Sequence, residues 1–448
     1  MRVLFLLTAG CLLSPGAALA HAAEGGFVLL LPTDFYVAGG AAVVALTVLL
    51  LAVAPSWRPE RVLRPVVGLP ALPPRLAPIT QTVSLALFLL MLWSGTFGPT
   101  DPLRNPMTLG LWTVFWIGLV GVQALIFDIW RWLNPFAALC RLVGQVIPNP
   151  PMARYSPNGW AAVVLFLAFS GFLLADPAPS DPRRLAVFAA GYMIFTALVA
   201  TIYGPRWLVR GEFVTVLMRT YRQTALAGAR ACGPNGWRIL RLGKPSLAMA
   251  VFMLILLGSG SFDGLNETFW WLGLLGVNPL EFPGRSEVIL PTLAGLLTVN
   301  AGLILAYGLS IRLGLSMASG GVAYRTAFIV FAPSILPIAA GYHLAHYLTS
   351  FLVDGQHVMS VLSYTIGLGE RPVTTGFFNR LDTVRLIWLT QAGAVVIGHV
   401  VAILVAHALA LRVFPDPRRA TLSQLPLALF MVGYTVFGLW LLAAPKGA

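Results

Sequence analysis

A histidine-rich stretch is the part of the chain whose residue types and spacing best suit chemistry. It runs Gly341-Tyr-His-Leu-Ala-His-Tyr347 and is followed by Asp354-Gly-Gln-His357, so it holds three of the six histidines. His343 and His346 are three residues apart, which places both on one face of a helix. They lie inside an apolar run long enough to cross a membrane. An ionisable side chain is costly there and indicates a functional site.

Histidine and carboxylate side chains near this stretch predict a metal site. His343, His346 and His357 are the expected ligands of a divalent metal, together with Asp263 or Asp354. Imidazole and carboxylate ligands with one open position suit such an ion, which makes its bound water acidic enough to supply hydroxide. The identity of the metal stays open. The alternative is that these are core histidines, hydrogen-bonded to neighbouring helices.

A second set of polar residues lies in a later apolar run. His399 and His407 are eight residues apart and therefore share a helix face, two turns apart. Gln391 lies nearly on the same face as His399. Together with His343, these histidines could bind haem b between two helices. They could instead form part of a proton path.

The composition is that of a polytopic membrane protein. Of the 448 residues, 58% are hydrophobic and only 10% are charged, whereas a soluble domain carries about 25% charged residues. The three cysteines form no Cys-x-x-Cys pair, which argues against a thiolate metal site or a structural disulfide. The net charge of +13 fits membrane topology better than a nucleic-acid partner.

The chain is expected to form one all-α membrane bundle behind a signal peptide. Residues 1–20 combine an arginine, an apolar core and an Ala-Leu-Ala cleavage form, which leaves residues 21–448 as a single polytopic domain. Ten apolar runs follow, each near the about 20 residues that a spanning helix needs. We place them at 36–54, 79–97, 108–127, 158–175, 185–204, 246–262, 289–311, 326–348, 386–411 and 424–444.

Basic residues predict the orientation of the bundle. Of the 29 Lys and Arg residues, 20 fall in the loops on one side, 8 in those on the other, and Arg2 in the leader. Cytoplasmic loops carry the excess of Lys and Arg, so both mature termini are expected to be periplasmic, in a bacterial inner membrane. The basic loop 205–245 would be cytoplasmic, with a helix anchored to anionic lipid. Loops 263–288 and 353–384 would be periplasmic.

Several short motifs resemble bacterial integral membrane proteins catalogued as fenitrothion hydrolase. The motifs are Asp128-Ile-Trp-Arg-Trp-Leu-Asn-Pro135, Ser261-Phe-Asp-Gly-Leu265, His346-Tyr-Leu-Thr349 with Asp354-Gly-Gln356, Gly398-His399 and Ala406-His407. They occur in the same order as in that family, and the likeness covers most of the mature chain. The resemblance implies a membrane-bound enzyme that hydrolyses an organophosphate triester at a P–O–aryl bond. The positions shared with the family pattern are Asp263, His346, Gln356, His399 and His407.

These observations favour a metal-assisted hydrolase whose site opens outward. A small apolar ester would reach the site from the lipid bilayer or the periplasm, and Asp263 and Asp354 are the expected catalytic carboxylates. A transporter or metal-handling protein would use the same histidines for binding without chemistry. A non-enzymatic subunit of a membrane complex is a third alternative, with loop 205–245 as its docking face.

Overall fold

The computed structural model describes residues 28, 30–70, 75–148, 150–152, 157–279 and 284–446, so the predicted signal peptide 1–20 lies outside the described residues. Most of the described residues are helical. The α-helices are α3 (Thr33–Val53), α4 (Leu76–Phe97), α5 (Pro106–Thr108), α6 (Val120–Leu125), α7 (Trp130–Leu133), α8 (Pro135–Val146), α9 (Trp160–Ala175), α10 (Pro182–Tyr203), α11 (Arg206–Arg210), α12 (Phe213–Tyr221), α13 (Leu247–Asn266), α14 (Phe269–Leu274), α15 (Ile289–Met317), α16 (Tyr324–Phe331), α17 (Leu336–Thr365), α18 (Leu381–Val413) and α19 (Pro417–Ala443).

The remaining elements are short, apart from one π-helix. The 3-10 helices are η2 (Pro59–Arg61), η4 (Ile239–Arg241), η6 (Arg285–Val288), η7 (Ala332–Ile335) and η8 (Gly376–Asn379). The π-helix is η3 (Leu109–Leu119), which continues into α6. Strands β1 (Val67–Gly68) and β2 (Ala231–Cys232) pair antiparallel.

Nine helical segments in the described part of the chain are long and apolar enough to cross a membrane. They confirm the all-α, polytopic membrane fold, and each coincides with one of the predicted spans. The remaining predicted span, 158–175, corresponds to α9. Its 16 residues are apolar but fewer than the about 20 that a full crossing needs. Helices α3 and α4 bury few of their apolar side chains, as expected of helices that face lipid.

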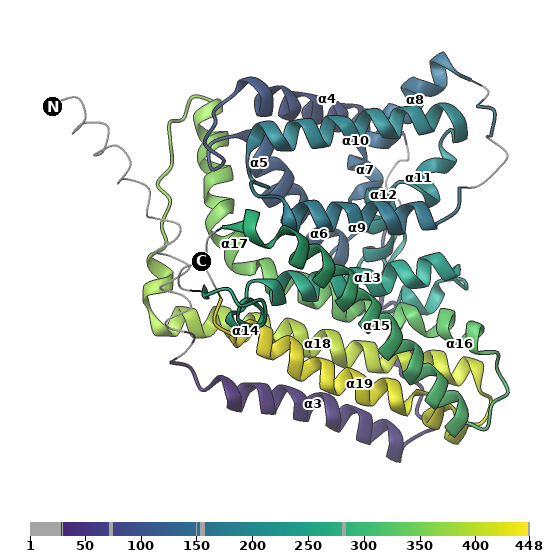
Figure 1. Ribbon diagram of the computed structural model, residues 1–448. Helices are drawn as coiled ribbons and strands as arrows, with labels where there is room; N and C mark the ends of the chain where they lie inside the picture. Colours follow the sequence, from purple (N-terminus) through teal and green to yellow (C-terminus); the bar gives the residue numbers. More distant parts are fainter. Residues whose placement is uncertain are drawn as a thin grey trace.

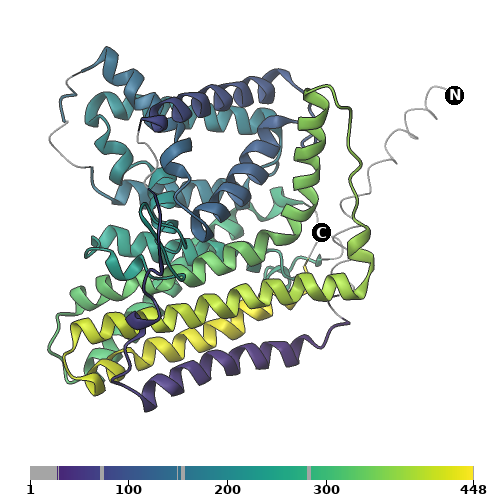
Figure 2. The ribbon, with the colours of Figure 1, turned by 180° about the vertical axis from the view of Figure 1, so that it is seen from behind.

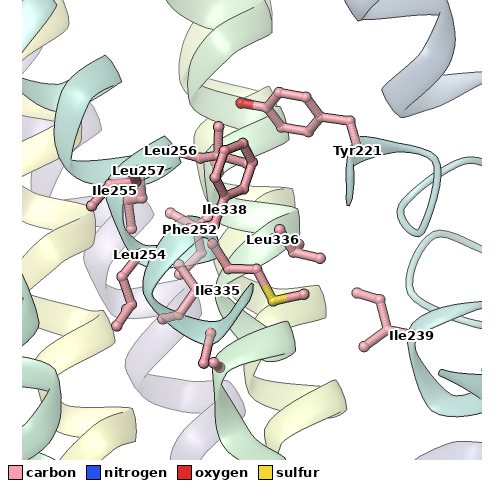
Figure 3. Packing of buried hydrophobic residues seen from close by; sticks show 14 of the residues in the cluster. Tyr221, Ile239, Phe252, Leu254, Ile255, Leu256, Leu257, Ile335, Leu336 and Ile338 are labelled. Carbon is pink, nitrogen blue, oxygen red and sulfur yellow. The ribbon is translucent and has the colours of Figure 1, made fainter. Parts of the chain in front are cut away.

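Two groups of helices are joined through a central pair (Figure 1). Helices α3, α15, α18 and α19 run alongside one another in one group, and α4, α8 and α10 pack together in the other. Between the groups lie α13 and α17, which are mostly buried; Figure 2 shows the same arrangement from behind. In Figure 3, α13 and α17 contribute buried side chains to one cluster, to which Tyr221 of α12 also belongs. The two helices that carry the predicted site are therefore central.

Glycines allow a close contact between α17 and α18. A Cβ atom on Gly341 of α17 would stand 2.5 Å from the carbonyl oxygen of Ala394 on α18. Likewise, a Cβ atom on Gly398 of α18 would stand 2.6 Å from the carbonyl oxygen of Pro337 on α17. Small residues let membrane helices approach this closely. The contact fixes the depth and rotation of α17, and with them the positions of its histidines.

Helix α17 is longer than the sequence predicts. It runs without a break from Leu336 to Thr365, so the first part of the predicted loop 353–384 is helical. Asp354 and His357 therefore lie on the helix. Polar residues end the hydropathy signal near residue 348 without ending the helix, because no proline interrupts the chain between Pro337 and Pro372.

The basic loop 205–245 is folded into the bundle. Nearly every residue of α12 is buried, and α12 packs against α9 and α17. Glu212 caps this helix, since its carboxylate accepts hydrogen bonds from the N–H groups of Val214 (2.8 Å) and Thr215 (2.7 Å) and from the Tyr192 hydroxyl (2.5 Å). Burial raises the pKa of Glu212. The prediction of a lipid-anchored helix is wrong for α12, because protein covers its apolar residues.

Both described ends of the chain lie at one face of the bundle, which we call the C-terminal face. Val28 and Leu31, which precede α3, belong to one buried cluster with Leu439 and Leu441 near the end of α19. At the opposite face, loop 54–70 meets the basic loop through the pairing of β1 with β2. An even number of membrane crossings would place both ends there, and the nine long segments reach an even number only together with the shorter α9.

We expect a reporter that is active only in the cytoplasm to be silent when fused after Ala448. The arginine-rich loops lie at the opposite face, and arginine-rich loops are retained in the cytoplasm. The same reporter inserted after the exposed Gly243 should be active. Activity of the fusion after Ala448, with silence of the insertion after Gly243, would reverse the expected orientation.

Candidate functional site

An aspartate–histidine pair links the two central helices. The Oδ2 atom of Asp263, near the end of α13, lies 3.1 Å from Nε2 of His346 on α17. The hydroxyl of Tyr347 donates a hydrogen bond to the same carboxylate oxygen. Asp263 is only 8% exposed, and a buried carboxylate needs such partners. We call Asp263 and His346 the dyad.

The dyad determines which nitrogen of His346 can act as a base. A carboxylate only accepts hydrogen bonds, so Nε2 carries the proton when the imidazole is neutral. Nδ1 then has a free lone pair, and no hydrogen-bond partner for it occurs among the described residues. A carboxylate orients the histidine base of a catalytic triad in the same way. His346 is therefore arranged to take up a proton.

The dyad lies between two cavities of very different size. The large cavity, of about 930 Å³, extends toward the C-terminal face, and Asp263, His346 and Tyr347 line it. The same three side chains line the small chamber, of about 30 Å³, deeper in the bundle. A cavity needs about 10–15 Å³ of free volume to hold one water molecule, so the small chamber has room for about two.

The walls of the large cavity combine apolar and charged side chains. Leu109, Trp112 and Ile117 of the π-helix supply an apolar wall. Arg285 and Glu267 line it near the C-terminal face, with 4.0 Å between their charged groups. The cavity can therefore accept a largely apolar molecule that has a polar end.

His343 faces the small chamber but has a different partner from His346. Its Nε2 lies 2.9 Å from the carbonyl oxygen of Trp116, so Nε2 donates. Trp116 belongs to the π-helix and lines both cavities; π-helical turns are frequent at functional sites. The rings of Trp116, Tyr221 and Tyr347 surround His343 at centroid distances of 5.3, 5.9 and 4.9 Å. These contacts fix His343 in the chamber wall.

The predicted metal ligands do not come together among the residues that the structure describes. No group of three His, Cys, Asp or Glu side chains is placed there to hold a metal ion. His357 follows His346 by eleven residues on α17, about 16 Å of helix, and Asp354 follows it by eight, about 12 Å. The prediction placed these residues close together because it assumed a loop. The dyad supplies two ligands, one fewer than a catalytic zinc site uses.

The polar residues predicted on α18 find partners within the bundle. Gln391 donates from Nε2 to the carbonyl oxygen of Ala345 (2.8 Å) and lines the large cavity. The Nδ1 atom of His399 bonds to the carbonyl oxygen one turn earlier (2.8 Å), and His407 bonds to Gln424. Neither histidine lines either cavity. His399 and His407 therefore make no contact with the dyad, and the haem and proton-path hypotheses gain no support from the structure.

Two tyrosines are site residues that the histidine spacing does not reveal. Tyr347 bonds to Asp263, and the Tyr342 ring is parallel to that of His346, with 5.9 Å between centroids and 10° between planes. Residues four apart are neighbours on a helix, so Tyr342 before His346 and His343 before Tyr347 form two adjacent pairs. That pattern was visible in the sequence and could have identified both tyrosines.

Comparison with family models, curated proteins and solved structures finds no match to this chain.

Proposed function

We propose that the protein is a membrane-embedded hydrolase of small apolar esters, with organophosphate triesters as the first class to test. The observation that carries this proposal is the position of the dyad between the small chamber and the large cavity. A hydrolase needs a base that meets water on one side and substrate on the other. The resemblance of the sequence motifs to fenitrothion hydrolases suggests the ester class.

The reaction needs one proton acceptor and one nucleophile. Water gives a proton to Nδ1 of His346 while its oxygen attacks phosphorus. The new P–O bond forms, the P–O–aryl bond breaks, and the aryloxide leaves with the bonding electrons. Asp263 accepts the hydrogen bond from Nε2–H and stabilises the imidazolium, while Tyr347 holds the carboxylate. The proton on Nδ1 then passes to the aryloxide. No step passes through a metal, since the described ligand set does not fit one.

The large cavity has the size and lining that such a substrate needs. Sites for small organic ligands typically occupy about 300–1,000 Å³ and are mostly apolar, and this cavity has about 930 Å³. Arg285 and Lys446 line it as well and would attract the anionic product of hydrolysis. Asp354, the second predicted carboxylate, also lines it and lies apart from the dyad.

Turnover by the purified protein in lipid nanodiscs tests the proposal. We expect release of the phenol from a neutral aryl phosphate triester, because the cavity is largely apolar and water has its own chamber. A charged aryl phosphate monoester of matched leaving group should react far more slowly. Uptake of intact triester into proteoliposomes, without phenol release, would contradict the proposal and would place the dyad in a transporter.

A further inference from the structure

The hydroxyl group of Tyr342 is buried beside the dyad without a hydrogen-bond partner. Tyr342 is 4% exposed, and its Oη atom has no partner among the described residues. An unpaired buried hydroxyl costs free energy, so a polar group that water or a ligand supplies would stabilise it. The Tyr342 side chain lines the small chamber, as does His346.

A glycine brings this hydroxyl close to the free nitrogen of His346. A Cβ atom on Gly264 of α13 would stand 2.1 Å from Oη of Tyr342 and 3.7 Å from Nδ1 of His346. Only glycine leaves room for the phenol at this point. Both atoms therefore lie beside the same point on α13, close enough for one water molecule to bridge them through two hydrogen bonds.

We propose that Tyr342 is a further catalytic residue, whose hydroxyl and the Nδ1 atom of His346 together hold the water that attacks the ester. This inference rests on the proposed function. The phenol O–H donates a hydrogen bond to one lone pair of the water oxygen, and one O–H of the water donates a hydrogen bond to Nδ1. The remaining lone pair of the water oxygen is then free to attack phosphorus. The proton in the hydrogen bond to Nδ1 moves to this nitrogen during the attack.

The ring of Tyr342 has a separate role from its hydroxyl. Its parallel contact with the imidazole helps to fix the plane of His346, which sets the direction of the Nδ1 lone pair. The substitution Tyr342→Phe keeps that contact and removes only the hydroxyl. It therefore separates the binding of water from the positioning of the base.

We expect Tyr342→Phe to lower kcat for triester hydrolysis by about 10- to 100-fold with KM unchanged, since a lost hydrogen bond to the nucleophile weakens general-base catalysis. Gly264→Ala should give a loss of similar size, because the new methyl group displaces the hydroxyl. The matched control is Tyr307→Phe. The Tyr307 hydroxyl is equally buried but donates to the Phe328 carbonyl oxygen (2.7 Å) away from both cavities, so kcat should not change.

A second measurement does not depend on turnover. The 15N chemical shift of Nδ1 in His346 reports whether this nitrogen accepts a hydrogen bond, and we expect Tyr342→Phe to move it and Tyr307→Phe to leave it unchanged. An unchanged shift and unchanged kcat in Tyr342→Phe would overturn the inference, while inactivity of His346→Ala would still support the hydrolase. If the wild type hydrolyses no ester, the proposed function fails, and the chemical shift alone decides whether Tyr342 and His346 share a water.

Discussion

His346→Ala is expected to lower kcat for triester hydrolysis by about 10²- to 10⁴-fold, the usual contribution of a general base. The substitution removes the free Nδ1 lone pair of His346, a residue that lines both cavities. Asp263 keeps the hydrogen bond from Tyr347, so the protein should still fold. Steady-state kinetics in nanodiscs, with melting temperature as a check on folding, measure the effect.

His357→Ala is the matched control for this prediction. His357 lies on the same helix but lines neither cavity, so its kcat should equal that of the wild type. Asp263→Asn should lie between the two, because it removes the negative charge while leaving an oxygen within reach of both partners. Full activity of His346→Ala, with loss of activity in Asp354→Ala, would move the base to the second carboxylate and refute the role of the dyad.

The sequence was sufficient to predict the nine long crossing helices and part of the candidate site. Apolar runs near 20 residues long predict crossing helices because lipid leaves few other solutions for the backbone. Asp263 follows one apolar run, and His346 lies near the end of another. Both runs end on the same side of the membrane, so the two residues were predicted at one boundary. Because the two residues lie at a similar depth in the membrane, they meet when α13 and α17 pack together at the centre of the bundle.

Other features depend on contacts that no local pattern encodes. The separation of His357 from the dyad follows from the continuation of α17 through residues where hydropathy falls, so the metal site was predicted from an assumed loop. The burial of α12 depends on its packing with α9 and α17, although the many arginines of loop 205–245 suggest a surface. The role of Tyr342 depends on Gly264, a residue distant in sequence whose significance appears only when α13 and α17 meet.

The two cavities also explain why an isolated aspartate–histidine pair can be useful inside a membrane protein. Hydrolysis needs water, which the hydrocarbon core does not supply. Polar side chains, among them Tyr221 and Ser170, line the small chamber. The large cavity can hold an apolar molecule near the same base. With water in one space and the substrate in the other, the two would compete less for the position beside the dyad.

Gly314→Ala is expected to destabilise the protein strongly, because α15 and α19 are in backbone contact at this position. A Cβ atom on Gly314 would stand 1.9 Å from the carbonyl oxygen of Ser423 and 2.8 Å from its carbonyl carbon. Backbone cannot move aside as a flexible side chain can, so the helices must separate. Overpacking of this kind costs about 1–3 kcal/mol, occasionally more, and should lower the melting temperature in detergent by several degrees.

The same helix supplies the control for this prediction. Gly302 also lies on α15, and a Cβ atom added there would meet nothing within 4 Å. Gly302→Ala should therefore leave the melting temperature unchanged or raise it, since alanine favours helix over glycine by about 1 kcal/mol. The difference between the two variants isolates the helix contact from the general effect of alanine. Equal melting temperatures for both would show that α15 and α19 do not meet at Gly314, and the packing of the helix group formed by α3, α15, α18 and α19 would have to be revised.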